Sequence, residues 1–291
     1  MAHIGEDRLA RLLRRDRAIT TAGLAALCAL AWLYVATGAG LGHSAWDMTT
    51  LSLFPHKAAA PMGGMSMPGM DMSGADMSGM ALSADWSAAR WALVVAMWQT
   101  MMVAMMAPSA TPTVLLYARV HRHALGQGRS EGLAPTAAFV AGYLLAWLGF
   151  SLAAAGLQWA LERSGLVSAA TLGSQSRWLS AAVLIGAGLY QLSPLQAVCL
   201  NHCRSPATFL SRHWRPGAAG AVRLGGLHGA YCVGCCWMLM ALLFVGGLMN
   251  LAWIGALTLL VMAEKVFPGG RWVSRAGAIV LLAWGAATLA V

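Results

Sequence analysis

Residues 227–263 read LHGAYCVGCCWMLMALLFVGGLMNLAWIGALTLLVMA, a stretch without a single charged side chain. The stretch is far too long for one membrane helix, because about 20 apolar residues suffice to cross roughly 30 Å of hydrocarbon. Gly246, Gly247 and Asn250 are the residues at which it would break. The sequence therefore predicts two apolar helices joined by a tight hairpin.

The rest of the chain has the same apolar character. Of the 291 residues, 59% are hydrophobic and 10% are charged, and the mean hydropathy is +0.64. A soluble domain could not cover so much apolar surface. Lipid offers no hydrogen-bond partner to the backbone, so segments without the alternation of barrel strands must cross as helices. The predicted fold class is all-α, a polytopic transmembrane helical bundle.

Seven apolar runs are candidates for membrane spans, and the sixth is the shortest of them. The first follows a basic segment that is similar to the start of a signal peptide, but its apolar part exceeds the 7 to 15 residues of a signal sequence, so we interpret it as a retained anchor helix. The seven runs cover residues 18–38, 88–108, 135–157, 178–195, 227–246, 251–264 and 274–291.

The basic residues give the predicted orientation. With a cytoplasmic N-terminus, 15 of the 19 Lys and Arg residues fall on the cytoplasmic side of the seven-span arrangement, as the positive-inside rule requires. The net charge of +9 is then explained by topology and anionic lipid headgroups, and no basic soluble domain is left to bind nucleic acid. The four basic residues placed outside are Lys57, Arg90, Arg163 and Arg177.

A methionine-rich tract lies in the predicted outer loop of residues 39–87. Seven of the 18 methionines fall within 19 residues, among Gly, Pro, Asp71 and Asp76. Such a tract should be flexible without a ligand, and it has no packing reason to choose thioethers, which are soft ligands for Cu(I). Copper capture competes with an apolar surface loop or plain low complexity. The methionines are Met62, Met65, Met67, Met70, Met72, Met77 and Met80.

A second group of methionines lies in the run 88–108. Met97, Met101 and Met105 are spaced four residues apart, with Met102 and Met106 beside them, and side chains four apart share one face of a helix. Pro108 is predicted to end or kink this helix. The stripe could supply thioether ligands, and it could equally be ordinary core packing.

Five of the six cysteines form two clusters, each with a histidine. His228, Cys232, Cys236 and Met240 are spaced four residues apart with Cys235 alongside, and Cys199-x-x-His202-Cys203 closes the fourth run. Imidazole, thiol and thioether groups on one stripe favour a soft metal ion. Thiol redox chemistry and inert packing remain open alternatives. Zinc is a weaker candidate, because nothing is similar to paired zinc-finger ligands.

The end of the sixth run carries two charged residues, Glu264 and Lys265. An acidic group near the membrane interior is a functional candidate by default. Snorkelling of both side chains to the interface explains the pair equally well.

Three ordered motifs resemble those of a known protein family. They are MWQTMMVAMMAP from Met97, PLQAVCLNHCR from Pro194, and CVGCCW from Cys232 with GLMN and Glu264-Lys265 following. They resemble an uncharacterised bacterial family of predicted metal-binding integral membrane proteins, some of which are labelled copper chaperones. The resemblance covers roughly residues 91–270 and implies a metal-handling role in the bacterial inner membrane.

Two functions follow as hypotheses. The first is a Cu(I)-handling membrane protein that transports the ion or delivers it to a copper protein partner, and the absence of a Walker motif argues against ATP-driven transport. The second is a membrane thiol-disulfide oxidoreductase, which leaves the methionines unexplained. The predicted parts are a basic N-terminus with anchor helix (1–38), an outer methionine-rich loop (39–87) and a six-helix metal-binding domain (88–291).

Overall fold

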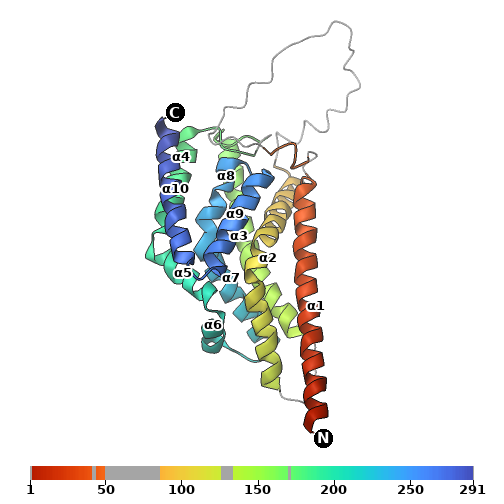
Figure 1. Ribbon diagram of the computed structural model, residues 1–291. Helices are drawn as coiled ribbons and strands as arrows, with labels where there is room; N and C mark the ends of the chain where they lie inside the picture. Colours follow the sequence, from red (N-terminus) through yellow and green to blue (C-terminus); the bar gives the residue numbers. More distant parts are fainter. Residues whose placement is uncertain (1, 41–43, 50–85, 126–133, 170–171, 291) are drawn as a thin grey trace, which may run out of the picture.

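The computed structural model describes residues 2–40, 44–49, 86–125, 134–169 and 172–290. The regular secondary structure in these ranges is helical, apart from one β-bridge between Val167 and Ser174. The all-α prediction is therefore confirmed for the described part of the chain (Figure 1). The helices are α1 (Ala2–Ala36), α2 (Ala88–Leu125), α3 (Ala134–Arg163), α4 (Arg177–Gln191), α5 (Pro194–Arg204), α6 (Pro206–His213), α7 (Gly217–Ala241), α8 (Leu243–Gly246), α9 (Leu251–Val266) and α10 (Gly270–Ala290).

Five segments of the described chain are long and apolar enough to cross a membrane. Helices α4 and α5 reach that length only together, and they are bent by 63° where they meet, so the bent pair would be a sixth crossing. The predicted number of seven is not confirmed, because α9 has only 16 residues. The five segments are Arg17–Ala36, Ala88–Arg122, Ala134–Arg163, Gly217–Gly246 and Gly270–Ala290.

The predicted run 178–195 is divided by a helix start that the apolar pattern conceals. The Ser193 hydroxyl accepts a hydrogen bond from the Gln196 backbone N–H at 3.2 Å, and Pro194 occupies the first turn of α5. A capping serine followed by proline is a strong start signal for a new helix. The chain therefore changes direction before the motif that carries Cys199 and Cys203.

The predicted break in residues 227–263 is confirmed. Helix α8 ends at Gly246, Gly247 takes a positive φ of 91°, and Asn250 caps α9 by accepting a hydrogen bond from the Trp253 N–H. The Asn250 amide also donates to the Gly246 carbonyl at 3.1 Å. The asparagine thus satisfies polar groups at both ends of the turn.

The sequence predicted that Pro108 would end or kink its helix. Helix α2 does not end there, because it continues through Pro108 and Pro112 to Leu125. Pro108 has no N–H to donate to the carbonyl four residues earlier, that of Ala104. The Trp32 indole of α1 donates to this carbonyl at 3.1 Å, and the Cys28 thiol lies 3.7 Å from it. Helix α1 therefore supplies the hydrogen bond that the proline removes.

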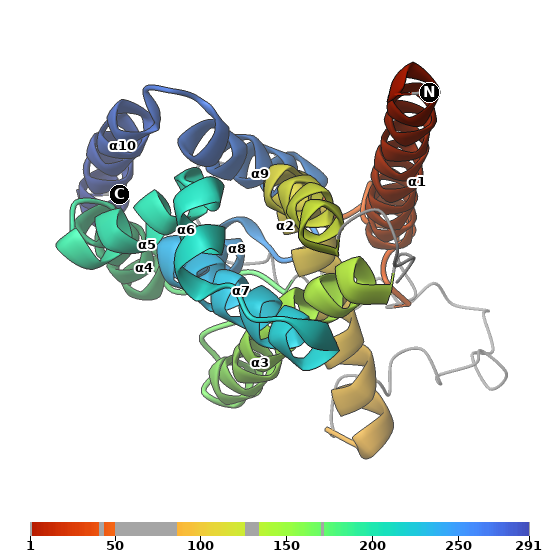
Figure 2. The same ribbon diagram turned by 90° about the horizontal axis from the view of Figure 1, so that it is seen from below.

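Helix α7 lies near the middle of the bundle, with α1 at one edge and α10 at the other (Figure 2). It approaches α3 so closely that a Cβ on Gly225 would overlap the Phe139 carbonyl. Small residues that permit backbone contact are typical of packing between membrane helices. The N- and C-termini lie at opposite ends of the bundle (Figure 1).

Reporter fusions can determine the orientation. If the N-terminus is cytoplasmic, the charge distribution predicts outer-side signals from alkaline phosphatase placed after Ala60, Ala170 and Val291. The same enzyme should be inactive after Leu125, Arg215 and Gly270, where a fluorescent protein should be active instead. An outer-side signal after Leu125 together with an inner-side signal after Val291 would reverse the predicted topology.

Candidate metal-binding site

Three thiols of α7 form the buried centre of the candidate site. Cys232, Cys235 and Cys236 are each at most 2% exposed and carry free thiols. The Cys235 and Cys236 thiols donate to the Cys232 backbone carbonyl at 3.1 Å and 2.9 Å. These bonds turn both side chains back along the helix, and they place three sulfurs within one turn of α7.

Helix α2 adds a thioether to this centre. The Cys236 Sγ lies 3.8 Å from the Met106 Sδ, and both residues are buried. Met106 lies just before Pro108, in the part of α2 that α1 supports through the Ala104 carbonyl. The sequence places Met106 beside the methionine stripe, whereas the structure makes it the thioether that meets the cysteines.

Helix α9 directs a charged side chain into the same group of sulfurs. The Lys265 Nζ lies 2.9 Å from the Cys232 Sγ, 3.8 Å from the Met106 Sδ and 3.4 Å from the Ser109 hydroxyl oxygen. Only 8% of Lys265 is exposed. The sequence left open that the Lys265 side chain snorkels to the surface, and the structure excludes this explanation.

Helix α3 completes the surroundings of Cys232. The Tyr143 hydroxyl lies 3.2 Å from the Cys232 Sγ, and the Tyr143 ring lies 5.8 Å from the His228 ring between centroids, at a tilt of 30°. His228 is 2% exposed, and its Nδ1 has no hydrogen-bond partner within the described residues. The His228 Nδ1, one helical turn from Cys232, is therefore a further candidate metal-ligand atom near the thiols.

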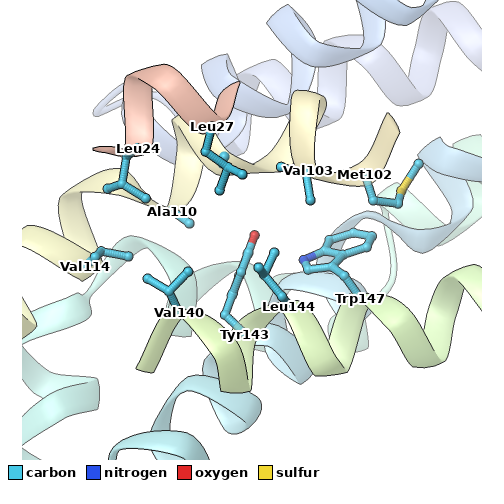
Figure 3. Close-up of a pocket in the computed structure, with 11 residues that line it drawn as sticks. Leu24, Leu27, Met102, Val103, Ala110, Val114, Val140, Tyr143, Leu144 and Trp147 are labelled. Atoms are coloured by element: carbon cyan, nitrogen blue, oxygen red, sulfur yellow. The ribbon is translucent and has the colours of Figure 1, made fainter. Parts of the chain in front are cut away.

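Tyr143 also borders an apolar pocket between α1, α2 and α3 (Figure 3). The lining is almost entirely apolar. The Tyr143 hydroxyl reaches in among these residues (Figure 3) and lies 3.2 Å from the Cys232 Sγ. The pocket lining includes Leu24, Leu27, Met102, Val103, Leu144 and Trp147.

Helix α5 brings the second cysteine pair against α7. A Cβ on Gly234 would lie only 2.8 Å from the Cys199 Sγ, so glycine lets this sulfur lie against the α7 backbone without displacement. The Cys203 thiol interacts with Cys232 and Cys235. Cys199 and Cys203 are only partly buried. The α5 thiols thus form the more exposed side of the cysteine group.

A polar network holds α5 against α9. The Gln191 amide donates to the Glu264 carboxylate at 2.6 Å, and the Gln196 amide donates to the Gln191 amide oxygen at 2.8 Å. The Arg204 guanidinium donates to the backbone carbonyls of Glu264, Phe267 and Pro268 at 2.7 to 2.8 Å. Glu264 therefore faces α4 and α5, while its neighbour Lys265 faces the sulfurs.

Other predicted ligands have different contacts or are identified only by their burial. The His202 ring stacks on Tyr231 at 4.1 Å between centroids, and its Nδ1 faces the Val198 carbonyl. Met240 is fully buried, as are all members of the α2 stripe. The methionines from Met62 to Met80 lie outside the described residues. The fully buried stripe consists of Met97, Met101 and Met105.

The side chains now in contact form a mixed set that sequence spacing alone does not identify. In the described ranges, no group of three or more His, Cys, Asp or Glu residues is arranged to hold a metal ion as it stands. Thiols and a thioether from two helices are nevertheless close together, and this donor set suits a soft ion such as Cu(I). The sequence missed Met106 and Tyr143 as partners of the thiols, because each contacts them from another helix.

Comparison with known proteins identifies one family. A family model described as "PpoB2: Copper chaperone" matches residues 95–288. The match includes every helix that contributes to the sulfur group, and it leaves out α1 and the methionine tract. No curated protein and no solved structure matches the chain.

Burial predicts an order of thiol modification. In metal-free, detergent-solubilised protein, N-ethylmaleimide should modify Cys199 and Cys203 before Cys232, Cys235 and Cys236, because the α7 thiols are almost fully enclosed. Mass spectrometry of peptides after timed quenching would give the order. Denatured protein serves as the control, in which all five rates should converge. Early modification of Cys232 in folded protein would contradict the buried geometry.

Proposed function

The chain belongs to the PpoB2 copper chaperone family, and on this premise we propose that it is a membrane protein that binds Cu(I) at Cys232, Cys236 and Met106. It then passes the ion to a partner copper protein. The observation that carries the proposal is the meeting of thiols from α7 with a thioether from α2 in a buried place. Thiolate and thioether are the ligand types that select Cu(I).

The spacing of the sulfurs supports a shared ion. Two sulfurs that each lie about 2.3 Å from one ion in tetrahedral geometry are themselves about 3.8 Å apart. The Cys236 Sγ and the Met106 Sδ lie 3.8 Å apart. Cu(I) would therefore require little movement of this pair, and Cys232 is the adjacent third ligand. His228 and Cys235 are the reserve donors beside it.

A membrane location is part of the proposal. Five long apolar helices and the excess of basic residues on one side of the predicted topology support a multi-pass protein of the bacterial inner membrane. The two termini lie at opposite ends of the bundle (Figure 1), which is the arrangement expected for an odd number of membrane crossings. The seven-span arrangement would count the bent α4 and α5 pair and the short α9 as crossings.

The exposed and buried sulfurs suggest a division of labour. The methionine tract would collect copper outside the membrane, the α2 and α7 site would hold it, and Cys199 and Cys203 on α5 would be its route to a partner. A thioether needs no deprotonation and forms no disulfide, so it suits an oxidising compartment. Ligand exchange between neighbouring sulfurs needs no nucleotide hydrolysis.

Ligand variants test the buried site. Replacing Cys232 and Cys236 by Ser should abolish tight Cu(I) binding, and Met106→Leu should weaken it by more than the roughly 10- to 100-fold that loss of an outer contact costs. The controls are Cys28→Ser, whose thiol faces the Ala104 carbonyl, and Met102→Leu, which lines the apolar pocket. Competition with a chromogenic Cu(I) chelator would measure the affinities. Equal losses in Met102→Leu and Met106→Leu would refute the assigned thioether.

Deleting Met62 to Met80 tests the collecting role. Neutral thioethers on a flexible loop should bind weakly, because each ligand must be ordered on binding. The deletion should therefore impair copper-dependent growth only when copper is scarce, whereas the Cys232 and Cys236 double variant should fail at every copper level. The same defect in both strains across a copper titration would contradict the two-stage scheme. A cysteine variant that fails only in a thiol-oxidation assay would favour the oxidoreductase.

A further inference from the structure

Lys265 is a buried cation that contacts two sulfurs and a hydroxyl. Its ammonium contacts Cys232, Met106 and Ser109, and no carboxylate in the described ranges lies within ion-pair distance of it, since the one ion pair found there joins Arg90 and Glu162. The adjacent Glu264 side chain is turned toward Gln191 on another side of α9. A cation in such a place needs partners of its own.

The ammonium and the proposed copper ion would compete for the same atoms. The Lys265 Nζ lies 2.9 Å from the Cys232 Sγ and 3.8 Å from the Met106 Sδ, which are two of the three proposed ligands. An ion bound to both sulfurs at about 2.3 Å would fall in the space that the ammonium now fills. The two cations cannot be present together, because they would collide and repel each other.

We propose that Lys265 is an internal competitor that occupies the copper position in the metal-free protein and is displaced when Cu(I) binds. This inference rests on the proposed function. Cu(I) and an ammonium both carry one positive charge, so the exchange of one cation for the other does not itself change the charge beside Cys232. A Cys236 thiol that becomes a thiolate ligand must in addition release its proton to solvent. The one-for-one exchange of cations keeps a positive charge beside the buried sulfur in either state.

The position of Lys265 in α9 gives the displaced side chain somewhere to go. It is the second-last residue of the helix, and the next two residues, Val266 and Phe267, are 54% and 63% exposed. A lysine has a long flexible stem that can lie along apolar surface while its ammonium reaches water or headgroups. Rotation about the side-chain bonds is therefore sufficient, and the helix need not move.

The polar network described above keeps the helix itself in place. Arg204 binds the last carbonyls of α9, and Gln191 binds the Glu264 carboxylate one residue before the lysine. The backbone at Lys265 is thus attached to α4 and α5. The Lys265 side chain takes part in none of these bonds, so it can move when copper binds while the helix stays in place.

The small number of lysines makes the test specific. The chain contains only Lys57 and Lys265, so acetic anhydride labelling followed by mass spectrometry reports on two lysine positions and the N-terminal amine. The full-length protein in lipid nanodiscs would be labelled in the metal-free state and after loading with Cu(I) under reducing conditions. Lys57, in the predicted outer loop, is the internal reference for reagent activity. Copper retention by the same samples would be measured in parallel.

The expected result is a severalfold rise in Lys265 labelling on copper loading, relative to Lys57. Cys232→Ser should remove this rise, because the variant lacks the ligand for which the two cations compete. Copper retention with unchanged Lys265 labelling would overturn the displacement and leave the proposed function intact. Failure of the wild-type protein to retain copper would overturn the proposed function and the displacement with it. High labelling of Lys265 in the metal-free protein would show that the ammonium does not occupy the site.

Discussion

Backbone contact between α7 and its neighbours determines where the cysteines lie. Gly225 admits the Phe139 carbonyl of α3, and Gly234 admits the Cys199 sulfur of α5. With a larger residue at Gly225, the backbones of α7 and α3 would have to separate. A larger residue at Gly234 would displace the Cys199 side chain from its place against α7. The distances among Cys232, Tyr143 and Cys203 depend on these two approaches.

Polar groups in the apolar interior are the second constraint, and two of them are bonded by a side chain from another helix. The Ala104 carbonyl freed by Pro108 is taken by Trp32, and the Glu264 carboxylate is taken by Gln191. An unpaired polar group would be costly in such surroundings. Hydrogen bonds of this kind hold α1 to α2 and α9 to α4, so the sulfur group is surrounded by helices in fixed positions.

Membership of a copper chaperone family makes copper the first metal to consider for this group of sulfurs. A chaperone must bind its ion selectively and then release it. In the proposed site, buried thiols and a thioether would provide selectivity for a soft monovalent ion. The more exposed thiols on α5 would offer the ion a neighbouring ligand, and a lysine among the sulfurs would give the emptied site a compensating charge.

The sequence by itself determined the all-helical class, the break at Gly246 to Asn250 and the grouping of the cysteines along one helix, because composition and spacing along a helix are local properties. It left open whether α2 would end or kink at Pro108, and it did not predict the bend before α5, the contact of Met106 with Cys236 or that of Lys265 with Cys232. Periodicity shows which residues share a face of one helix. Only the tertiary structure decides which face of another helix lies opposite, because that depends on where small residues let two backbones meet.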